Sequence, residues 1–153
     1  MDRQEEALKA FIGLKRTQDL FDTILKKDVT QHGLTLNEFA VLELLYHRGE
    51  QAVQKIKERI LIASSSTTYV IDRLCSKGYV TRRPDQVDKR VIYVNLTESG
   101  HSLIESMFPE HAELIESLFS QLTTEEIHVL RENLKLISQT IRENLNPVEN
   151  EEK

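Results

Sequence analysis

Apolar residues recur every three or four positions along most of the chain, the spacing that gathers them on one face of an α-helix. The first stretch with this period runs from Gln4 to Val29. A helix of that length would measure roughly 39 Å, far more than a small domain needs to cover its own core. Later stretches with the same period begin near Thr35, Val53, Ser64, Thr97 and Thr123. The pattern therefore predicts six helices.

Capping residues and glycines support these boundaries. Thr35-Leu-Asn-Glu38 fits the capping box, in which a threonine and a glutamate satisfy each other's backbone N–H groups at the start of a helix. Gly33, Gly49 and Gly78 each follow a helical stretch, where a left-handed residue commonly ends a helix. Pro109 lies inside the fifth predicted helix, which we expect it to kink or interrupt.

Two strand-like runs interrupt the helical pattern, Tyr79–Arg83 and Val91–Leu96, and the segment Pro84–Lys89 turns between them. Three helices followed by such a hairpin are typical of a helix-turn-helix with a wing. The predicted fold class is therefore mainly α with a small β-hairpin wing, a winged helix-turn-helix flanked by long dimerisation helices.

The pattern divides the chain into four parts: an N-terminal dimerisation helix (1–34), a winged helix-turn-helix region (35–96), C-terminal dimerisation helices (97–145) and a flexible tail (146–153). In the last helix, apolar residues follow steps of three and four, a narrow seam that suits a partner helix. This seam consists of Ile127, Leu130, Leu134, Ile137 and Ile141. Because the terminal helices offer more apolar surface than one small core can cover, we expect a homodimer. The alternative is a seam that packs within its own chain.

The net charge of −5 hides an uneven distribution. Residues 70–96 carry six Lys and Arg against three Asp and Glu, whereas residues 97–153 carry four against twelve. A local basic segment can bind phosphates while acidic surface elsewhere keeps a protein soluble. The chain has one cysteine, no apolar run of the ~18 residues that a membrane helix needs, and no signal-peptide pattern. We therefore expect a cytoplasmic protein with no membrane partner.

The helix that begins at Ser64 combines an apolar face, formed by Val70, Ile71 and Leu74, with a hydroxyl-rich one. Small hydroxyl side chains at its N-terminus can enter the major groove without clashing, and the helix N-terminus favours phosphates. The residues of this recognition helix that we expect to contact DNA are Ser64, Ser65, Ser66, Thr67, Thr68, Tyr69 and Arg73. The alternative is a serine-rich helix start with no role beyond solubility.

Four cations lie around the turn of the hairpin: Arg82 and Arg83 end the first strand, and Lys89 and Arg90 begin the second. Bringing four cations together is costly unless an anion meets them, and a narrow minor groove supplies negative potential that accepts an arginine. We expect these four side chains to bind DNA, with Asp88 paired to Arg90 to orient its guanidinium. The alternative is a solvated tip whose charges only prevent edge-to-edge aggregation.

Five short motifs follow one another in a fixed order within residues 71–100. They are Ile71-Asp-Arg-Leu74, Lys77-Gly-Tyr-Val80, Arg82-Arg83, Asp88-Lys-Arg90 and Leu96-Thr-Glu-Ser-Gly100. Together they resemble the signature of the MarR family of winged helix-turn-helix regulators, and the helical flanks resemble that family's dimerisation region. The segments Leu36–Gly49 and Ser64–Leu74 are most similar to its quinone-responsive, MhqR-like branch.

The resemblance implies a DNA-binding repressor that binds a pseudo-palindromic operator in double-stranded DNA as a homodimer and releases it when a small effector binds. It also implies that Arg90 is the family's minor-groove arginine. The residues that correspond to the family's major-groove face are Ser65, Ser66, Thr68, Tyr69 and Arg73.

The resemblance further places the effector between the dimerisation helices and the winged helix. The residues near this possible pocket are Phe11, Lys15, Phe39, Leu42, Tyr46, Met107, Phe108 and His111. Aromatic residues with a few polar groups suit a flat phenolic or quinone-like ligand. Each of these residues taken singly is also typical of an ordinary core.

Other chemistry is weakly indicated. Cys75 is the redox candidate, but its place beside Leu74 favours inert packing. The five histidines form no local metal-ligand pair, so we expect no metal and no other cofactor. The sequence contains no glycine-rich phosphate-binding loop and no nucleophile elbow, so we do not expect an enzyme. The remaining alternative is a winged-helix protein-interaction module without sequence-specific DNA binding, and the sequence does not distinguish a repressor from an activator.

Overall fold

The computed structural model describes residues 2–60 and 64–146, with side chains for all of these except 64–66. The predicted contacts of the Ser64, Ser65 and Ser66 side chains, and the predicted tail beyond Asn146, lie outside the described residues. By its internal contacts the chain divides into two compact units, residues 1–109 and 110–153.

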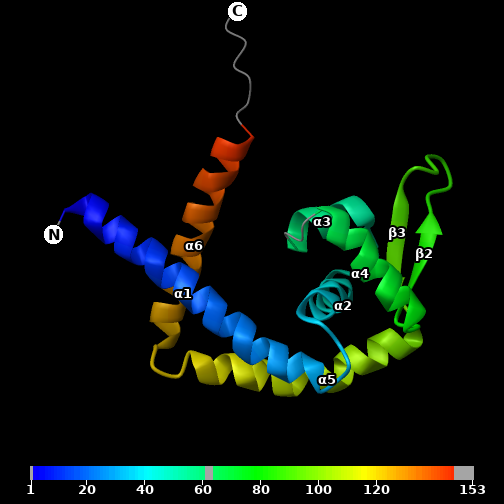
Figure 1. The fold of residues 1–153 in the computed structure, drawn as a ribbon, viewed down its shortest axis with the longest axis horizontal. Coiled ribbons are helices and arrows are strands. Elements are labelled where there is room, and N and C mark those ends of the chain that lie inside the picture. Colours follow the sequence, from blue (N-terminus) through cyan, green and yellow to red (C-terminus); the bar gives the residue numbers. More distant parts are fainter. Residues whose placement is uncertain (1, 61–63, 147–153) are drawn as a thin grey trace, which may run out of the picture. The chain divides into compact units, whose positions relative to one another are not determined.

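The described residues form six helices and three short strands (Figure 1). The helices are α1 (Arg3–Thr30), α2 (Leu36–Arg48), α3 (Val53–Ile60), α4 (Ser64–Ser76), α5 (Glu98–Leu118) and α6 (Thr124–Leu145). The strands are β1 (Gln51–Ala52), β2 (Val80–Pro84) and β3 (Ile92–Leu96). The mainly helical fold with a small β-wing, predicted from the hydrophobic pattern, is confirmed.

Positive-φ glycines follow the helix ends as predicted, whereas only half of the predicted capping box at Thr35 forms. Gly33, Gly49 and Gly78 have φ values of 72°, 75° and 78°. Thr35 Oγ1 accepts the N–H of Glu38 at 3.1 Å, which is one half of the predicted capping box. The carboxylate of Glu38 instead pairs with Lys77, which also donates to the carbonyl of Gly33. Because Glu38 is only 3% exposed, its charge needs this partner.

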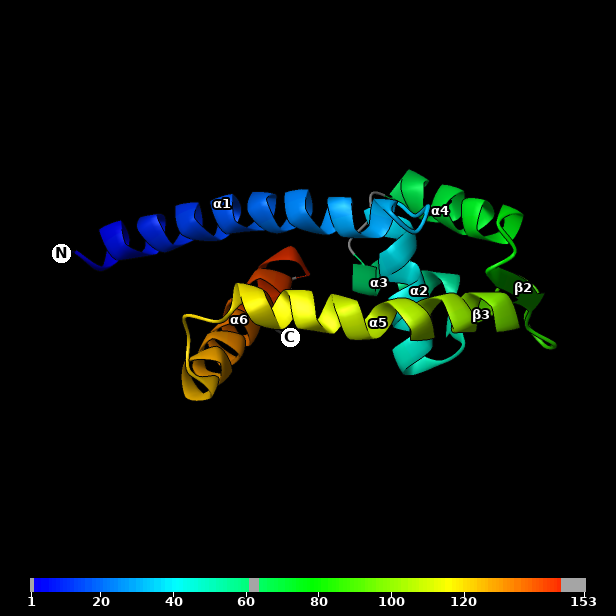
Figure 2. The same ribbon diagram turned by 90° about the horizontal axis from the view of Figure 1, so that it is seen from below.

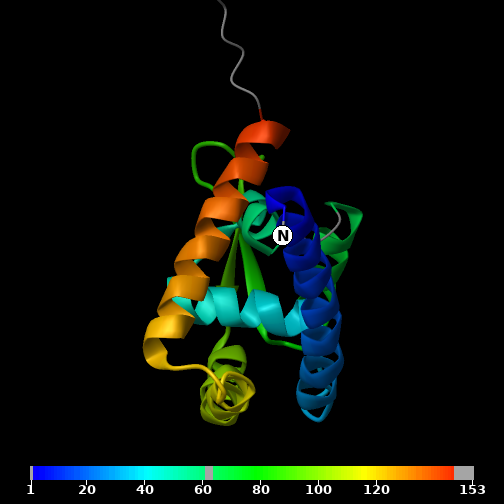
Figure 3. The ribbon, with the colours of Figure 1, turned by 90° about the vertical axis from the view of Figure 1, so that its left-hand side faces the viewer.

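The core of the first unit lies among α2, α3, α4 and the sheet. It takes one apolar face from each of these helices, the inward side chains of the strands, and buried side chains from the end of α1 and from α5. Its most deeply buried side chains include Val29, Val41, Leu42, Ile56, Ile71, Leu74, Val94 and Ile104. Figure 3 shows α2 passing in front of the paired strands, and Val41 and Leu42 of α2 share the core with Val94 of β3.

The sheet has the order β1-β3-β2 and is antiparallel throughout. Strand β1 was absent from the sequence-based prediction, because two residues are too few to show an alternating pattern. Pro84 is the last residue of β2, opposite Ile92, so the prediction that Pro84 turns the loop was wrong. A proline tolerates this place because a strand end at a sheet edge needs no N–H from it.

The long helices expose much of their apolar surface in the single chain. In the first unit, α1 extends well beyond α2 and the strands (Figure 2), and its Leu8 and Phe11 are 57% and 60% exposed. In the second unit, Ile137 and Ile141 of the α6 seam are 45% and 52% exposed. Helix α5 continues through Pro109 without interruption. Over the described ranges, no helix is long and apolar enough to cross a membrane.

Candidate nucleic-acid interface

Helix α4 presents a polar face beside its buried one. Val70, Ile71 and Leu74 are buried, while Thr68, Tyr69 and Arg73 are exposed, Tyr69 by 64%. The three exposed side chains offer a hydroxyl, a phenol and a guanidinium, all of which can bind phosphate oxygens or base edges.

Thr67 does not belong to this face. Its side chain is fully buried, and its Oγ1 has no hydrogen-bond partner among the described residues. The sequence-based assignment of Thr67 to the DNA-contacting set is therefore not supported by its position: in a run of similar hydroxyl residues, the helical period turns one of them into the core.

Replacing Thr67 by valine should leave the fold intact and change the free energy of unfolding by no more than about 1 kcal/mol, in the stabilising direction. Valine has the same shape and removes a buried hydroxyl without a partner, whereas most core substitutions destabilise. Chemical denaturation of Thr67→Val beside the wild type measures this difference. A clear loss of stability would show that the hydroxyl is satisfied in solution.

The tip of the wing is fixed by two carboxylates. Asp85 Oδ2 accepts the N–H groups of Val87 and Asp88 at 3.1 and 2.9 Å, and these bonds lower the pKa of Asp85. Both oxygens of Asp88 accept from the Arg90 guanidinium at 3.0 Å, and Asp88 Oδ1 also accepts the Arg90 backbone N–H. This pairing lowers the pKa of Asp88 and raises that of Arg90. The predicted Asp88–Arg90 pair is therefore present.

Arg90 is held by its partner and still projects into solvent. Its side chain is 91% exposed while Asp88 is 42% exposed, so the pair orients the guanidinium without covering it. Lys89 beside it is also exposed. The tip of the wing thus presents two cations, one of them directed by a bidentate contact, which is the arrangement that suits an anionic groove.

Arg82 and Arg83 lie within β2, not at the tip, and both have carboxylate partners. Arg82 pairs with Asp72 of α4, and Arg83 pairs with Glu50 before β1. The premise that four cations meet at the tip without an anion was therefore wrong. Sequence spacing could not reveal these partners, because Glu50 lies 33 residues from Arg83.

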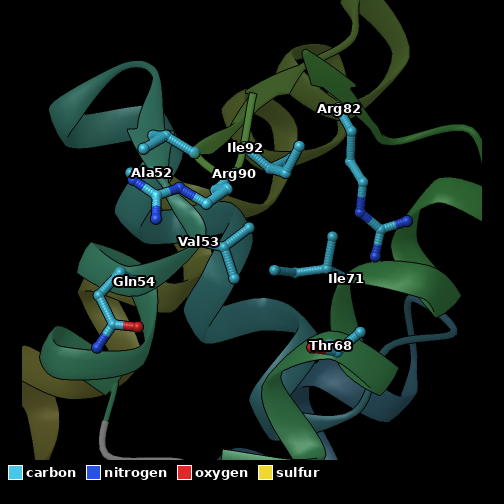
Figure 4. Close-up of a pocket in the computed structure, with 9 residues that line it drawn as sticks. Ala52, Val53, Gln54, Thr68, Ile71, Arg82, Arg90 and Ile92 are labelled. Atoms are coloured by element: carbon cyan, nitrogen blue, oxygen red, sulfur yellow. The ribbon is translucent and has the colours of Figure 1, made fainter. Parts of the chain in front are cut away.

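A depression of about 330 Å³ separates α4 from the wing (Figure 4). Arg82 reaches from its strand toward α4 on one side, and Arg90 lies on the other, with Ile71 and Val53 between them. Thr68 of α4 lines the same depression. The exposed part of the recognition helix and the directed arginine of the wing therefore border one concave surface.

The residues predicted to line an effector pocket fall into different environments. Phe39, Leu42 and Met107 are buried in the core. Phe11 and Lys15 are exposed on α1, and His111 belongs to the second unit.

Among the predicted pocket residues, Tyr46 and Phe108 lie with their ring centroids 6.1 Å apart. Two residues outside the predicted pocket set complete this aromatic cluster: the His47 ring centroid lies 4.9 Å from that of Phe108, and the His101 ring centroid lies 5.3 Å from that of Tyr46. His101 and Phe108 are seven residues apart and so share one face of α5, but nothing in the sequence spacing links them to Tyr46 and His47 of α2.

Cys75 is half-buried against the core, and its Sγ lies 3.7 Å from an Arg82 guanidinium nitrogen. Among the described residues, no three His, Cys, Asp or Glu side chains are grouped so that they could hold a metal ion.

A helix with exposed hydroxyl and cationic groups, next to a hairpin with a rigid cationic tip, defines a winged-helix DNA-binding protein. The MarR family profile matches residues 34–92. Over 133 residues, the chain is 42% identical to the HTH-type transcriptional regulator MhqR of Bacillus subtilis (strain 168), covering 87% of this chain and 92% of that protein. The chain therefore belongs to the MarR family and is a DNA-binding transcriptional regulator, not an enzyme.

Solved structures of the family share the fold. A mutant of E. coli MarR in complex with operator DNA matches with a TM-score of 0.77 and 25% identity, covering 90% of this chain and 99% of that one. NadR in complex with 4-hydroxyphenylacetate matches with a TM-score of 0.74 and 25% identity, covering 82% and 89%.

Proposed function

We propose that this protein is a cytoplasmic repressor that binds a pseudo-palindromic operator as a homodimer and releases it when a small phenolic or quinone-like effector binds. Two copies of α4 would enter successive major grooves, about 34 Å apart, while the two wings reach the flanking minor grooves. The operator complex of the related E. coli MarR supports the DNA-bound form.

The observation that carries this proposal is the geometry of Arg90. Its guanidinium is nearly fully exposed, yet both Asp88 oxygens fix its direction. An exposed arginine ordinarily loses side-chain entropy when it binds, and a guanidinium that is already oriented loses less. An oriented cation at the end of a hairpin fits a narrow minor groove.

The other proposed DNA contacts are made by side chains that are exposed on α4 and on the wing. Thr68, Tyr69 and Arg73 of α4 are proposed to contact the major groove, and Lys89 a phosphate near Arg90. Ser65 and Ser66 keep this role by resemblance to the family, and Ser64 by its position at the start of α4. Arg82 and Arg83, which face carboxylates of the same chain, are proposed to orient the wing.

The exposed apolar faces of α1 and α6 support the dimer. Leu8, Phe11, Ile137 and Ile141 each expose about half of their side chains in the single chain. Exposed apolar stripes of this kind, one on each helix, are typical of protein–protein interfaces. A second copy would cover them.

A phenolic effector is supported by the relative NadR, which is bound to 4-hydroxyphenylacetate, and by the aromatic cluster of Tyr46 and Phe108. A ligand that prefers one separation of the two α4 helices would shift the dimer toward that state and so change its affinity for DNA.

The test is to select operator fragments from a genomic library with the purified dimer, and to repeat the selection with 4-hydroxyphenylacetate or 1,4-benzoquinone present. We expect enrichment of a two-fold related sequence that either compound reduces. Binding that shows no sequence preference at any ionic strength would point instead to a protein-interaction module, while enrichment that neither compound alters would argue against this effector class.

Replacing Thr68 by alanine should alter base preference at one position of each half-site, because a hydroxyl in the major groove reads base edges. The expected cost is about 5-fold in affinity for the preferred base and little for other bases. Selection with the Thr68→Ala dimer measures this change. A uniform loss over all sequences would place Thr68 on the phosphate backbone.

A further inference from the structure

Glu50 occupies the turn between α2 and β1, directly after Gly49, whose φ of 75° reverses the chain. Its side chain is 30% exposed. One carboxylate oxygen accepts from Arg83 of β2 at 2.5 Å, and the other accepts from Asn95 of β3. A single side chain therefore joins the turn before β1 to both strands of the wing.

Arg83 is held from a second side as well. Its guanidinium carbon lies 4.8 Å from the ring centroid of Tyr93, the residue opposite it on β3. The contact with Glu50 raises the pKa of Arg83, and the guanidinium in turn lowers the pKa of Glu50. Both shifts favour the charged forms, so Glu50 and Arg83 face each other as an ion pair at neutral pH.

Arg82 and Arg83 are neighbours on one strand, so their side chains leave opposite faces of the wing. Arg82 connects one face to Asp72 of the recognition helix, and Arg83 connects the other face to Glu50. Two ion pairs on opposite faces fix the angle of the hairpin relative to the helices, which one ion pair alone would not do.

The angle matters most at the tip. Arg90 precedes Tyr93 by three residues, in the turn before β3, so it lies at most roughly 10 Å from Tyr93 along the strand direction. A rotation of the hairpin by about 10° at the Glu50 contact would therefore move Arg90 by up to about 2 Å. Hydrogen bonds weaken steeply over that distance.

We propose that Glu50 is a positioning residue for DNA binding: through Arg83 and Asn95 it holds the wing at the angle at which Arg90 meets the duplex, without touching DNA itself. This inference rests on the proposed function, in which the wing contacts the minor groove.

The direction in which one substitution changes the affinity for DNA distinguishes this positioning role from simple charge repulsion. Glu50→Gln removes a negative charge close to the surface that would face a polyanion, so charge repulsion alone predicts tighter binding of DNA. Loss of the contacts that Glu50 makes with Arg83 and Asn95 predicts weaker binding of DNA. Glu50→Asp keeps the charge but shortens the side chain by one methylene, so it should weaken binding without any change in net charge.

The experiment measures operator affinity of the full-length dimer by mobility shift at several salt concentrations. The variants are Glu50→Gln and Glu50→Asp, alone and combined with Arg90→Ala. Glu58→Gln is the matched control, because Glu58 is an exposed carboxylate of neighbouring α3 paired with Lys55. Circular dichroism spectra and thermal melting establish that each variant is folded.

We expect Glu50→Gln to weaken binding about 10-fold and to reduce the salt dependence toward that of Arg90→Ala, while Glu58→Gln has no such effect. In the Arg90→Ala background, Glu50→Gln should cost less than about 2-fold, because the group that it positions is gone. Should Glu50→Gln unfold the protein, Glu50→Asp must give the same coupling to Arg90.

Affinity of both Glu50 variants equal to or above that of the wild type would overturn the inference. An equal loss with and without Arg90 would do so too, since Glu50 would then act independently of the tip. These outcomes differ from a failure of the proposed function, which would appear first as an Arg90→Ala dimer that binds the operator normally.

Discussion

Replacing Arg90 by alanine should weaken binding of the dimer to duplex DNA by about 100-fold. Each dimer carries two wings, and a directed arginine contact is worth about 1–3 kcal/mol. The loss should be similar for all sequences, because a minor groove offers a nearly degenerate pattern of groups and the contact depends chiefly on its negative potential.

The salt dependence provides the sharper measurement. Each neutralised phosphate contributes about −0.9 to the slope of log K against log salt concentration. Arg90→Ala should therefore make the slope shallower by about two per dimer. Titrations at four or five ionic strengths determine this slope without knowledge of the operator's full sequence.

The matched control for Arg90→Ala is Arg131→Ala. Arg131 is an exposed arginine of α6 whose guanidinium lies 3.5 Å from Glu132, so its replacement causes the same change in net charge. If Arg131→Ala reproduced the loss seen with Arg90→Ala, the effect would come from net charge. If Arg90→Ala bound like the wild type, the wing would not contact DNA.

The sequence predicted those parts of the fold that depend on neighbouring residues. The helices follow from the apolar period, and the Asp88–Arg90 pair follows from a two-residue separation that leaves the side chains within reach. Local geometry of this kind is nearly independent of the rest of the chain.

The sequence could not predict features that depend on long-range packing. The burial of Thr67 depends on which face of α4 meets α2, and the partner of Arg83 depends on a turn 33 residues away. Likewise, the aromatic cluster joins Tyr46 and Phe108 from helices that only the complete core brings together. In each case the residue type follows from the sequence, whereas its environment depends on packing between distant segments.

Gly100 illustrates the same division. The motif Leu96-Thr-Glu-Ser-Gly100 was recognised by its resemblance to the family, but its physical reason lies in a contact with Tyr79. A Cβ built on Gly100 would lie 2.1 Å from the Tyr79 carbonyl oxygen, far inside any allowed contact. That oxygen also accepts the N–H of Thr97 at 3.0 Å, and Thr97 Oγ1 donates to the carbonyl of Gly78.

Gly100→Ala should therefore destabilise the fold by about 3 kcal/mol. Overpacking against a backbone atom costs about 1–3 kcal/mol, and displacing the Tyr79 carbonyl weakens a hydrogen bond worth about 1 kcal/mol. Alanine regains up to about 1 kcal/mol of helix propensity, which only partly offsets this cost. For a chain of this length the melting temperature should fall by about 6–12 °C.

Thermal and chemical unfolding of Gly100→Ala measure this loss, with Ser99→Ala as the control in the same helical turn. Ser99 is exposed, so its replacement changes helix propensity without approaching Tyr79. Wild-type stability of Gly100→Ala would mean that α5 begins farther from Tyr79 than the structure places it. Because Gly78 and Tyr79 join the recognition helix to the wing, a loss confined to Gly100→Ala would locate the strain at the junction that sets the direction of both DNA-contacting elements.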